Sequence, residues 1–490
     1  MVSSIDGLVS GLSTSSMISS LLQVEAAPQT RLKAKVAKAE SIISSYQSVN
    51  TKVSALKTAA DSLGQLSTWR AVKPTSSSTA VTAIATGGTD AVAGAIKFSV
   101  KDLAKAQSSA LRVSTATEQD PAFPDDPTKT RAVRLDVPDT ITLTVGVDDG
   151  FGNITGTPVE IDISQDKSAK GIQSKINAAG VGVKATLVKV SDTESVLQLN
   201  GTKTGADFAF SFAGLENAAC DGNGTTQTAT AANSRIEVGG GDGVPGGYTL
   251  TGSTNTFTGL LAGVTLTASK VEDDITVSST SDVAGMAAKF QALVDAANAA
   301  LGEVRTQTAY DPNTKVGSPL TGDFSVRQMS QSILSTISQG LSFRDPAAPA
   351  ALTSPTYTAE EIAADEELHT VNFGSLSKLG VALDSTGQLT FDAGKFTAAY
   401  NADPDAIKNA GTAFADSFEA LAGKQSTNLT SSITGRKNDI DSLSIQIENW
   451  DVRLVAKREA LQKTYAGLET ALSKLQSQST WLSGQIASLG

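Results

Sequence analysis

A seven-residue repeat of isoleucine and leucine near the C-terminal end of the sequence constrains the fold more than any other feature. Its positions are Ile433, Ile440, Ile447, Leu454, Leu461, Leu468, Leu475, Leu482 and Leu489. A straight helix drifts by about 20° per heptad, so this line stays on one face only if the helix supercoils around a partner. The repeat therefore predicts a long coiled-coil helix, with a long amphipathic helix in an ordinary bundle as the alternative.

A second apolar line in the same segment changes its register around Lys457. Its members are Leu443, Trp450, Tyr465, Leu472 and Ile486. The phase shift predicts either a kink or a change of packing partner near the middle of the helix.

The N-terminal region carries a matching heptad pattern. One line contains Ile42, Val49, Leu56 and Leu63, and the other contains Tyr46, Val53 and Ala60. A shorter helix starting near Ser15 should precede this one, and Pro28 predicts a break near Ala27. We expect the helices from both chain ends to pair in one stalk, with everything else inserted between them.

Residues 1–14 are rich in Gly and Ser but still contain apolar side chains. Such a segment is disordered by itself, unless a partner covers it. Exposed apolar stripes of this kind mark assembly surfaces. The candidate assembly residues are Ile5, Leu8, Leu12, Ile18, Leu21, Leu22, Ile42, Val49, Leu56, Leu63, Ile447, Leu454, Leu461, Leu468, Leu475, Trp481, Leu482, Ile486 and Leu489.

Between the heptad regions the sequence changes character. Residues 76–282 are rich in Thr, Gly and Val with period-two alternation, which predicts strands, and one helix is expected at 169–179. The fold class is therefore α+β and multidomain, with a helical stalk and an inserted β head of two lobes. Residues 121–127 and 239–247 are candidate crossings between the lobes.

The expected domains follow from these changes of pattern. They are terminal leg helices at 1–45 and 456–490, a stalk at 46–75 and 283–455, a proximal lobe at 76–135 and 235–282, and a distal lobe at 136–234. Within the stalk we expect a loop with one helical turn at 343–370 and a hairpin at 381–391. A break at Pro404 and separate helices should then precede the final long helix.

Composition argues against several functional classes. The net charge is −11, with 39 basic against 50 acidic residues, which disfavours nucleic acid. One cysteine, Cys220, excludes an intramolecular disulfide. We expect no membrane insertion, because no run of about 18 apolar residues occurs. No secretory signal is recognisable, which indicates a cytoplasmic protein unless another export route reads the N-terminus.

Residues suited to catalysis are scarce. With His369 as the only histidine, no Ser-His-Asp or Cys-His arrangement can be built. The glycines at 241, 243 and 246 have the spacing of a dinucleotide fingerprint, but they lie between two strand-like segments instead of before a helix. The acidic run at 360–367 lacks the spacing of a calcium loop. We therefore expect no enzyme, no cofactor and no metal site.

Four motifs in order resemble one known family over nearly the whole chain. They are residues 5–28, the strand and turn at 94–104, the segment 159–185, and the segment 375–389. The chain resembles bacterial flagellar filament cap proteins, also called the hook-associated protein 2 family. Segment 159–185 is similar to a repeat shared with flagellin. One departure is Ser13, where the family usually has Asp.

The resemblance implies a function that periodicity does not. Members leave the cell through the flagellar type III apparatus, which would place the chain outside the cell at the filament tip. It implies a ring of copies of the chain, commonly a pentamer, whose terminal helices contact flagellin while the head confines arriving subunits. A flagellar export chaperone and hook–filament junction proteins are the other implied partners. The alternatives are a hook–filament junction protein, an adhesin whose β head binds host surface glycans, and an enzyme in the head.

Overall fold

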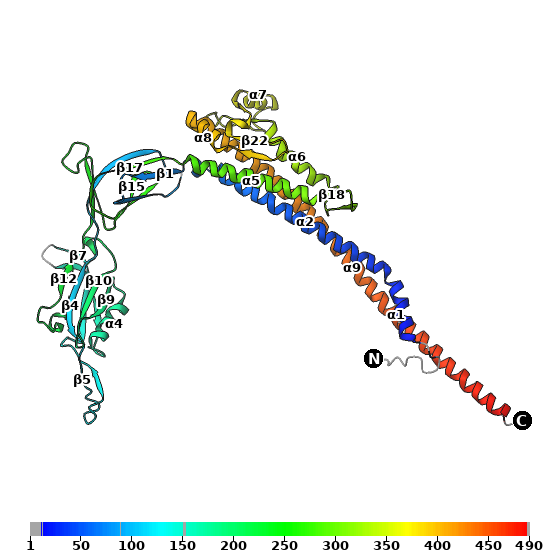
Figure 1. Cartoon of the computed structure of the whole chain (residues 1–490), viewed down its shortest axis with the longest axis horizontal. Helices are drawn as coiled ribbons and strands as arrows, with labels where there is room; N and C mark the ends of the chain where they lie inside the picture. Colours follow the sequence, from blue (N-terminus) through cyan, green and yellow to red (C-terminus); the bar gives the residue numbers. More distant parts are fainter. Residues whose placement is uncertain (1–10, 12, 89, 150–152, 488–490) are drawn as a thin grey trace. The chain divides into compact units, whose positions relative to one another are not determined.

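The computed structural model describes residues 11, 13–88, 90–149 and 153–487. The chain divides into two compact units (Figure 1). The helical unit contains Met1–Thr68 and Val283–Gly490, and the head unit contains Trp69–Asp282. The α+β architecture is confirmed, because helices from the two ends of the sequence pack together and the β head is inserted between them.

Helices of very different length make up most of the helical unit. They are α1 (Thr14–Glu25), α2 (Ala27–Gly64), α5 (Val283–Gln307), α6 (Phe324–Ser338), α7 (Ala359–His369), α8 (Ala393–Ala402) and α9 (Pro404–Ala487). Helix α2 packs along α9 and against α5 (Figure 1). Short paired strands join the helices: β18 (Tyr310–Asp311) with β19 (Val316–Gly317), β20 (Leu341–Arg344) with β21 (Thr370–Gly374), and β22 (Val381–Leu383) with β23 (Leu389–Phe391).

The N-terminal heptad lines form the buried face of α2. Val49, Val53, Leu56, Ala60 and Leu63 are all buried. At the start of the pattern Ile42 is only half-buried, and its neighbour Ile43 is buried instead. The expected break is confirmed, because α1 ends at Glu25 and α2 begins at Ala27 with a proline in its first turn.

The C-terminal helix is longer than the sequence indicated. Pro404 begins α9, as a proline at the first helical position can, and the helix then runs for 84 residues. At about 1.5 Å per residue it measures roughly 126 Å. The expected separate helices before residue 433 are therefore wrong, because no further proline interrupts the segment.

The core of the helical unit is aromatic. Phe290 on α5 is fully buried and lies 4.9 Å from Phe396, 5.5 Å from Phe391 and 6.2 Å from Phe414, measured between ring centroids. Phe414 also contacts Phe418 at 4.9 Å. These rings join α5, α8, α9 and the β22–β23 hairpin in a single packed cluster.

A partly buried hydrogen bond links α2 to the start of α6. The Tyr46 hydroxyl donates to Asp323, whose other carboxylate oxygen accepts N–H bonds from Ser325 and Val326 and so caps α6. Burial by itself raises the pKa of Asp323, but these hydrogen bonds outweigh it and hold the pKa below its usual value. Burial and the bond to Asp323 raise the pKa of Tyr46 to about 12.

Replacing Tyr46 by Phe should destabilise the helical unit by about 1.5–3 kcal/mol, since the carboxylate of Asp323 loses a hydrogen-bond donor.

The same carboxylate should make the stability of the helical unit depend on pH. Because the pKa of Asp323 is depressed in the folded state, the stabilisation that its ionised form provides is present above the unfolded pKa and is lost as pH falls through the folded pKa. Urea unfolding at pH 7 and near pH 3 checks both effects. In Asp323→Asn the loss of stability below pH 4 should be smaller; an unchanged loss would assign the acid sensitivity to other carboxylates.

Residues 343–370 form more structure than the expected loop with one turn. Strands β20 and β21 pair, and α7 is an 11-residue helix that begins with a capping box between Thr358 and Glu361. An ion pair of 2.8 Å between Arg344 and Asp365 attaches α7 to β20. The capping signal was present in the sequence, but α7 buries no residue and so lacks the apolar periodicity of a helix.

The head unit contains two hydrophobic cores. Around the first core lie a five-stranded sheet, ordered β1-β17-β3-β13-β14, and a three-stranded sheet, ordered β15-β16-β2. The strands are β1 (Val72–Ser76), β2 (Val81–Ala85), β3 (Gly94–Asp102), β13 (Ser234–Val238), β14 (Tyr248–Gly252), β15 (Thr256–Leu261), β16 (Val264–Ala268) and β17 (Glu272–Ser281).

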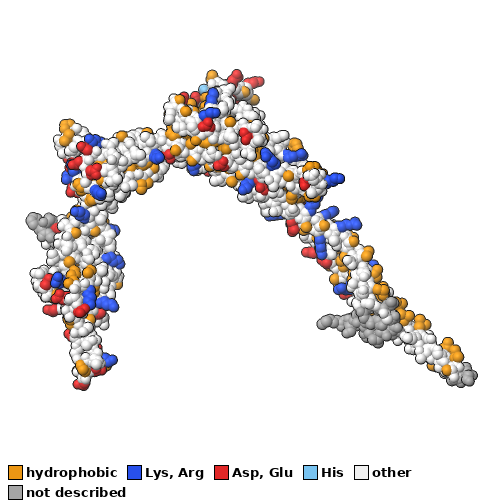
Figure 2. Space-filling model, viewed as in Figure 1, with side chains coloured by type: hydrophobic (Ala, Val, Ile, Leu, Met, Phe, Trp, Pro, Cys, Tyr) orange, Lys and Arg blue, Asp and Glu red, His pale blue; other side chains and the backbone are white. Residues whose placement is uncertain are grey.

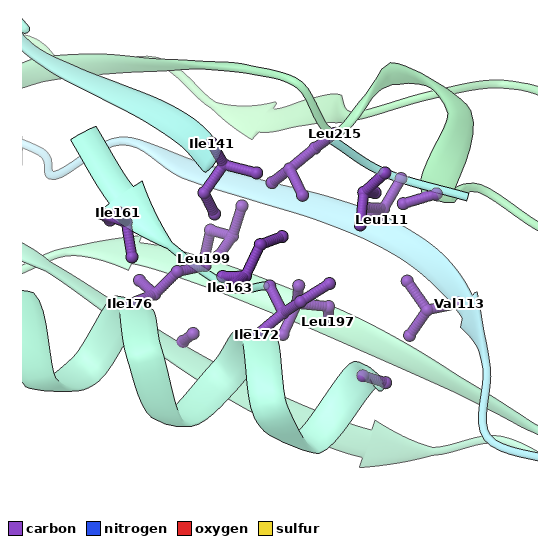
Figure 3. Packing of buried hydrophobic residues seen from close by; sticks show 14 of the residues in the cluster. Leu111, Val113, Ile141, Ile161, Ile163, Ile172, Ile176, Leu197, Leu199 and Leu215 are labelled. Atoms are coloured by element: carbon purple, nitrogen blue, oxygen red, sulfur yellow. The ribbon is translucent and has the colours of Figure 1, made fainter. Parts of the chain in front are cut away.

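The second core lies under α4 (Ala169–Ala179), with Ile172 and Ile176 facing the sheets (Figure 3). The sheets are ordered β12-β4-β10-β9 and β11-β7-β8. Their strands are β4 (Ser108–Ser114), β7 (Thr140–Asp148), β8 (Ile154–Asp162), β9 (Val183–Lys189), β10 (Glu194–Gly201), β11 (Ala209–Ala213) and β12 (Thr226–Ala229). The helix occupies the residues that the sequence predicted.

The division of the head differs from the sequence-based one at residues 108–135. Strand β4 pairs with β10, and Leu111, Val113 and Leu135 lie in the second core. The expected crossings are also wrong. Residues 239–247 form the turn of the β13–β14 hairpin, and 121–127 form the tip of the hairpin between β5 (Thr117–Gln119) and β6 (Thr130–Ala132).

Candidate assembly surface

The packing partner of α9 changes near the phase shift in its heptads. Gln29, in the first turn of α2, donates to the Asp451 carboxylate at 2.6 Å and to the Ile447 carbonyl at 3.3 Å. Six residues further along α9, Lys457 lies 3.9 Å from Glu25 at the end of α1. Of the two expectations for the phase shift, the structure shows a change of partner from α2 to α1 within an unbroken helix.

Helix α1 covers the next part of α9 with a small apolar face. Ile18 is 7% exposed and Leu22 is half-buried, whereas Leu21 and Val24 are exposed. Since α1 has only 12 residues, it spans about 18 Å of α9. The rest of α9 lies beyond its reach.

The outer end of α9 exposes large apolar side chains. Leu475 is 60% exposed and Trp481 is 65% exposed. We define the leg stripe as Leu468, Leu475, Trp481, Leu482 and Ile486. Spacings of seven, seven and four residues place the leucines and Ile486 on one face, with Trp481 beside it. Figure 2 shows hydrophobic side chains along this end of the helix.

The only histidine and the only cysteine of the sequence both lie among the described residues. His369 lies 3.5 Å from Asp365. A hydrogen bond from Arg344 is the main reason that the pKa of Asp365 lies below its usual value. Cys220 is an exposed free thiol. Among the residues that the structure describes, no cluster of His, Cys, Asp and Glu side chains could bind a metal ion. The described helices also contain no segment with the length and hydropathy of a membrane span.

Two family models match the chain. Flagellar hook-associated protein 2 C-terminus matches residues 231–477, half of the chain, and Flagellar hook-associated protein 2 N-terminus matches residues 10–107. The chain belongs to the flagellar hook-associated protein 2 family.

Named relatives agree with this family. Flagellar hook-associated protein 2 of Escherichia coli strain K12 is 29% identical over 244 residues, which are 47% of each protein. Its counterpart in Escherichia coli O157:H7 matches with the same identity and coverage. The chain thus spans about half the length of the curated relatives it matches. The fold is similar to the D1-D2-D3 domains of the flagellar cap protein FliD from Escherichia coli, with TM-score 0.53, 23% identity, and coverage of 82% of this chain and 99% of that one.

Ile18, Leu21 and Leu22 lie on α1 and Ile42 is half-buried on α2. The other candidate assembly residues of this hook-associated protein 2 family member fall into three groups. Val49, Leu56 and Leu63 are buried in the packing of the helical unit, and Ile447, Leu454 and Leu461 are half-buried along α9. The leg stripe is exposed. The last group, Ile5, Leu8, Leu12 and Leu489, lies outside the described residues.

Sequence reasoning missed a second exposed apolar group on α9. Ile445, Val452 and Val455 are 58–70% exposed, although they precede the leg stripe. They are off both heptad lines, so the repeat gave no signal for them. A helical wheel of the whole segment could have shown Ile445 and Val452 seven residues apart on the outer face.

Two glycines interrupt the outer part of α9, and we predict that they soften it. Gly467 and Gly484 have open space where a side chain would begin, so alanine fits at both positions. Each substitution should stabilise the helix by about 1 kcal/mol. Gly467→Ala/Gly484→Ala should therefore stiffen the leg and slow filament growth, measured as filament length against time. Unchanged growth and unchanged cap dissociation would show that leg softness has no role.

Proposed function

We propose that this chain is a structural cap at the distal tip of the bacterial flagellar filament. In this position it promotes the folding and insertion of exported flagellin subunits and prevents their loss. The observation that carries the proposal is the leg stripe, an apolar surface at the end of an 84-residue helix. It lies beyond α1, which is the last element that packs on α9 among the described residues. Family membership supplies the context for this surface.

The energetics of the leg stripe suit a cap that must move as the filament grows. Burying a leucine side chain completely contributes about 1.5–3 kcal/mol to the free energy of docking. A few such residues therefore give a contact that is stable but still reversible. A single exposed helix is marginal by itself in water, and docking stabilises it. The outer part of α9 therefore orders most firmly when it packs against the uppermost flagellin subunits.

The proposal includes the expected partners and location. The chain leaves the cell through the flagellar type III apparatus, with a flagellar export chaperone holding the C-terminal helix beforehand. At the tip it forms a ring of its own copies, with five as the expected number, and it meets hook–filament junction proteins before the filament grows. No catalytic step belongs to this function.

A deletion strain tests the proposal directly. We expect short or absent filaments and unassembled flagellin in the medium, with recovery when the full chain is supplied. Electron microscopy of a labelled chain should show it at the filament tip; label at the filament base would favour a hook–filament junction protein. Normal filaments in the deletion strain would overturn the proposal, and binding of glycans by the head alone would point to an adhesin.

A further inference from the structure

An open groove lies between α2 and α9 in the helical unit. Its volume is about 490 Å³, and its apolar floor contains Ala39, Ile42 and Leu443. Ile42 and Leu443 are the two heptad residues at this level that are only half-buried. The groove is therefore a place where the seam between the two helices is not closed.

The rim of this groove is basic. Lys35, Lys38 and Arg436 line it, against a single carboxylate, Asp439, which lies 3.4 Å from Arg436. Both lysines are exposed, and neither forms an ion pair with any described residue. The chain as a whole has a net charge of −11, so a rim with three basic side chains is a locally basic surface on an acidic protein. A basic rim around an apolar floor fits a partner that is acidic and amphipathic.

Helix α7 of the same chain has the complementary character. It buries no residue, and its exposed surface combines Glu360, Glu366 and Glu367 with Leu368, which is 78% exposed. Glu360 and Glu367 are seven residues apart, which is about 10.5 Å along the helix. Lys35 and Ile42 span the same length on α2, so a helix face of this size matches the groove.

We propose that α7 of a second copy of this chain docks in the groove between α2 and α9. Glu360 and Glu367 would face Lys35, Lys38 and Arg436, and Leu368 would cover the floor near Ile42 and Leu443. Within its own chain α7 is attached through Arg344 and the β20–β21 pair, and its acidic face is left exposed. Because groove and helix are different surfaces, the contact is heterologous and closes into a ring or continues as a chain of subunits.

This inference rests on the self-association in the proposed function, and a charge exchange tests it. In sedimentation velocity at low salt, Lys38→Glu and Glu367→Lys should each weaken self-association by about tenfold. The double variant Lys38→Glu/Glu367→Lys should recover it. The matched control is Lys424→Glu, an exposed lysine on α9 away from the groove, which should neither weaken association nor rescue Glu367→Lys.

A cross-link gives a readout that does not depend on affinity. In a Cys220→Ser background, mixing Lys38→Cys with Glu367→Cys should form a disulfide between the two variants under mild oxidation. The control mixture of Lys424→Cys with Glu367→Cys should not. Three results would each overturn the contact. They are a wild-type chain that stays monomeric, charge reversals at Lys38 and Glu367 that do not weaken self-association, and the absence of a disulfide between the two cysteine variants. Filament capping could stand in all three cases, because the deletion strain measures it separately.

Discussion

Replacing Leu475 and Leu482 by Asp is expected to abolish filament growth while the helical unit remains as stable as before. Both leucines belong to the leg stripe and are more than half exposed, so the free chain loses little when they change. In a docked leg each contributes about 1.5–3 kcal/mol. Losing both, and placing charges in an apolar contact, should weaken docking by more than about 100-fold.

Filament length and released flagellin measure this effect. Cells with Leu475→Asp/Leu482→Asp should have short or no filaments in electron micrographs, and an immunoblot should find flagellin in the medium. Thermal unfolding of the purified chain should match the wild type. A lower melting temperature would instead attribute the defect to folding.

The second exposed apolar group on α9 offers a matched control. Ile445→Asp/Val452→Asp removes two residues of similar size and exposure from the same helix and adds the same charge. If docking is confined to the leg stripe, this variant should form filaments of normal length. An equal defect in both variants would show that any apolar loss along α9 is harmful and would contradict a specific leg surface.

The helical unit was predictable because its signals are local. The buried face of α2 repeats every seven residues with large aliphatic side chains, and few other structures satisfy such a pattern. The same reasoning gave the pairing of the two chain ends. It placed a phase shift near Lys457 but left a kink and a change of partner as alternatives, and only the structure decides between them. It did not give the continuity of α9, because its first part, around Phe414 and Phe418, packs against α5 and α8 and has a broader apolar face than a heptad.

The division of the head was less predictable because strand pairing is not local. Alternation in β4 shows that Leu111 and Val113 share one face, but not that the partner is β10, more than eighty residues later. A Gly-rich segment similarly predicts a turn without saying which strands it joins. The groove between α2 and α9 has the same origin, since Lys38 and Arg436 meet only after the chain ends pair.

Truncating Phe290 to Ala should destabilise the helical unit more than any other single change considered for this chain. The ring is fully buried and packs against Phe391, Phe396 and Phe414. Removing it leaves a cavity among rings held on two separate helices and a hairpin, which cannot all move inward. The expected loss is about 3–5 kcal/mol, and urea unfolding followed by far-ultraviolet circular dichroism measures it.

Phe324 provides the matched control for this substitution, because it is a phenylalanine of the same unit that is 72% exposed. Phe324→Ala should change stability by less than about 0.5 kcal/mol. Since the head has cores of its own, Ile172→Ala should shift a different unfolding transition and leave that of the helical unit in place. If Phe290→Ala moved both transitions together, the two units would unfold as one cooperative body, and the stability of the stalk would depend on the head that it carries.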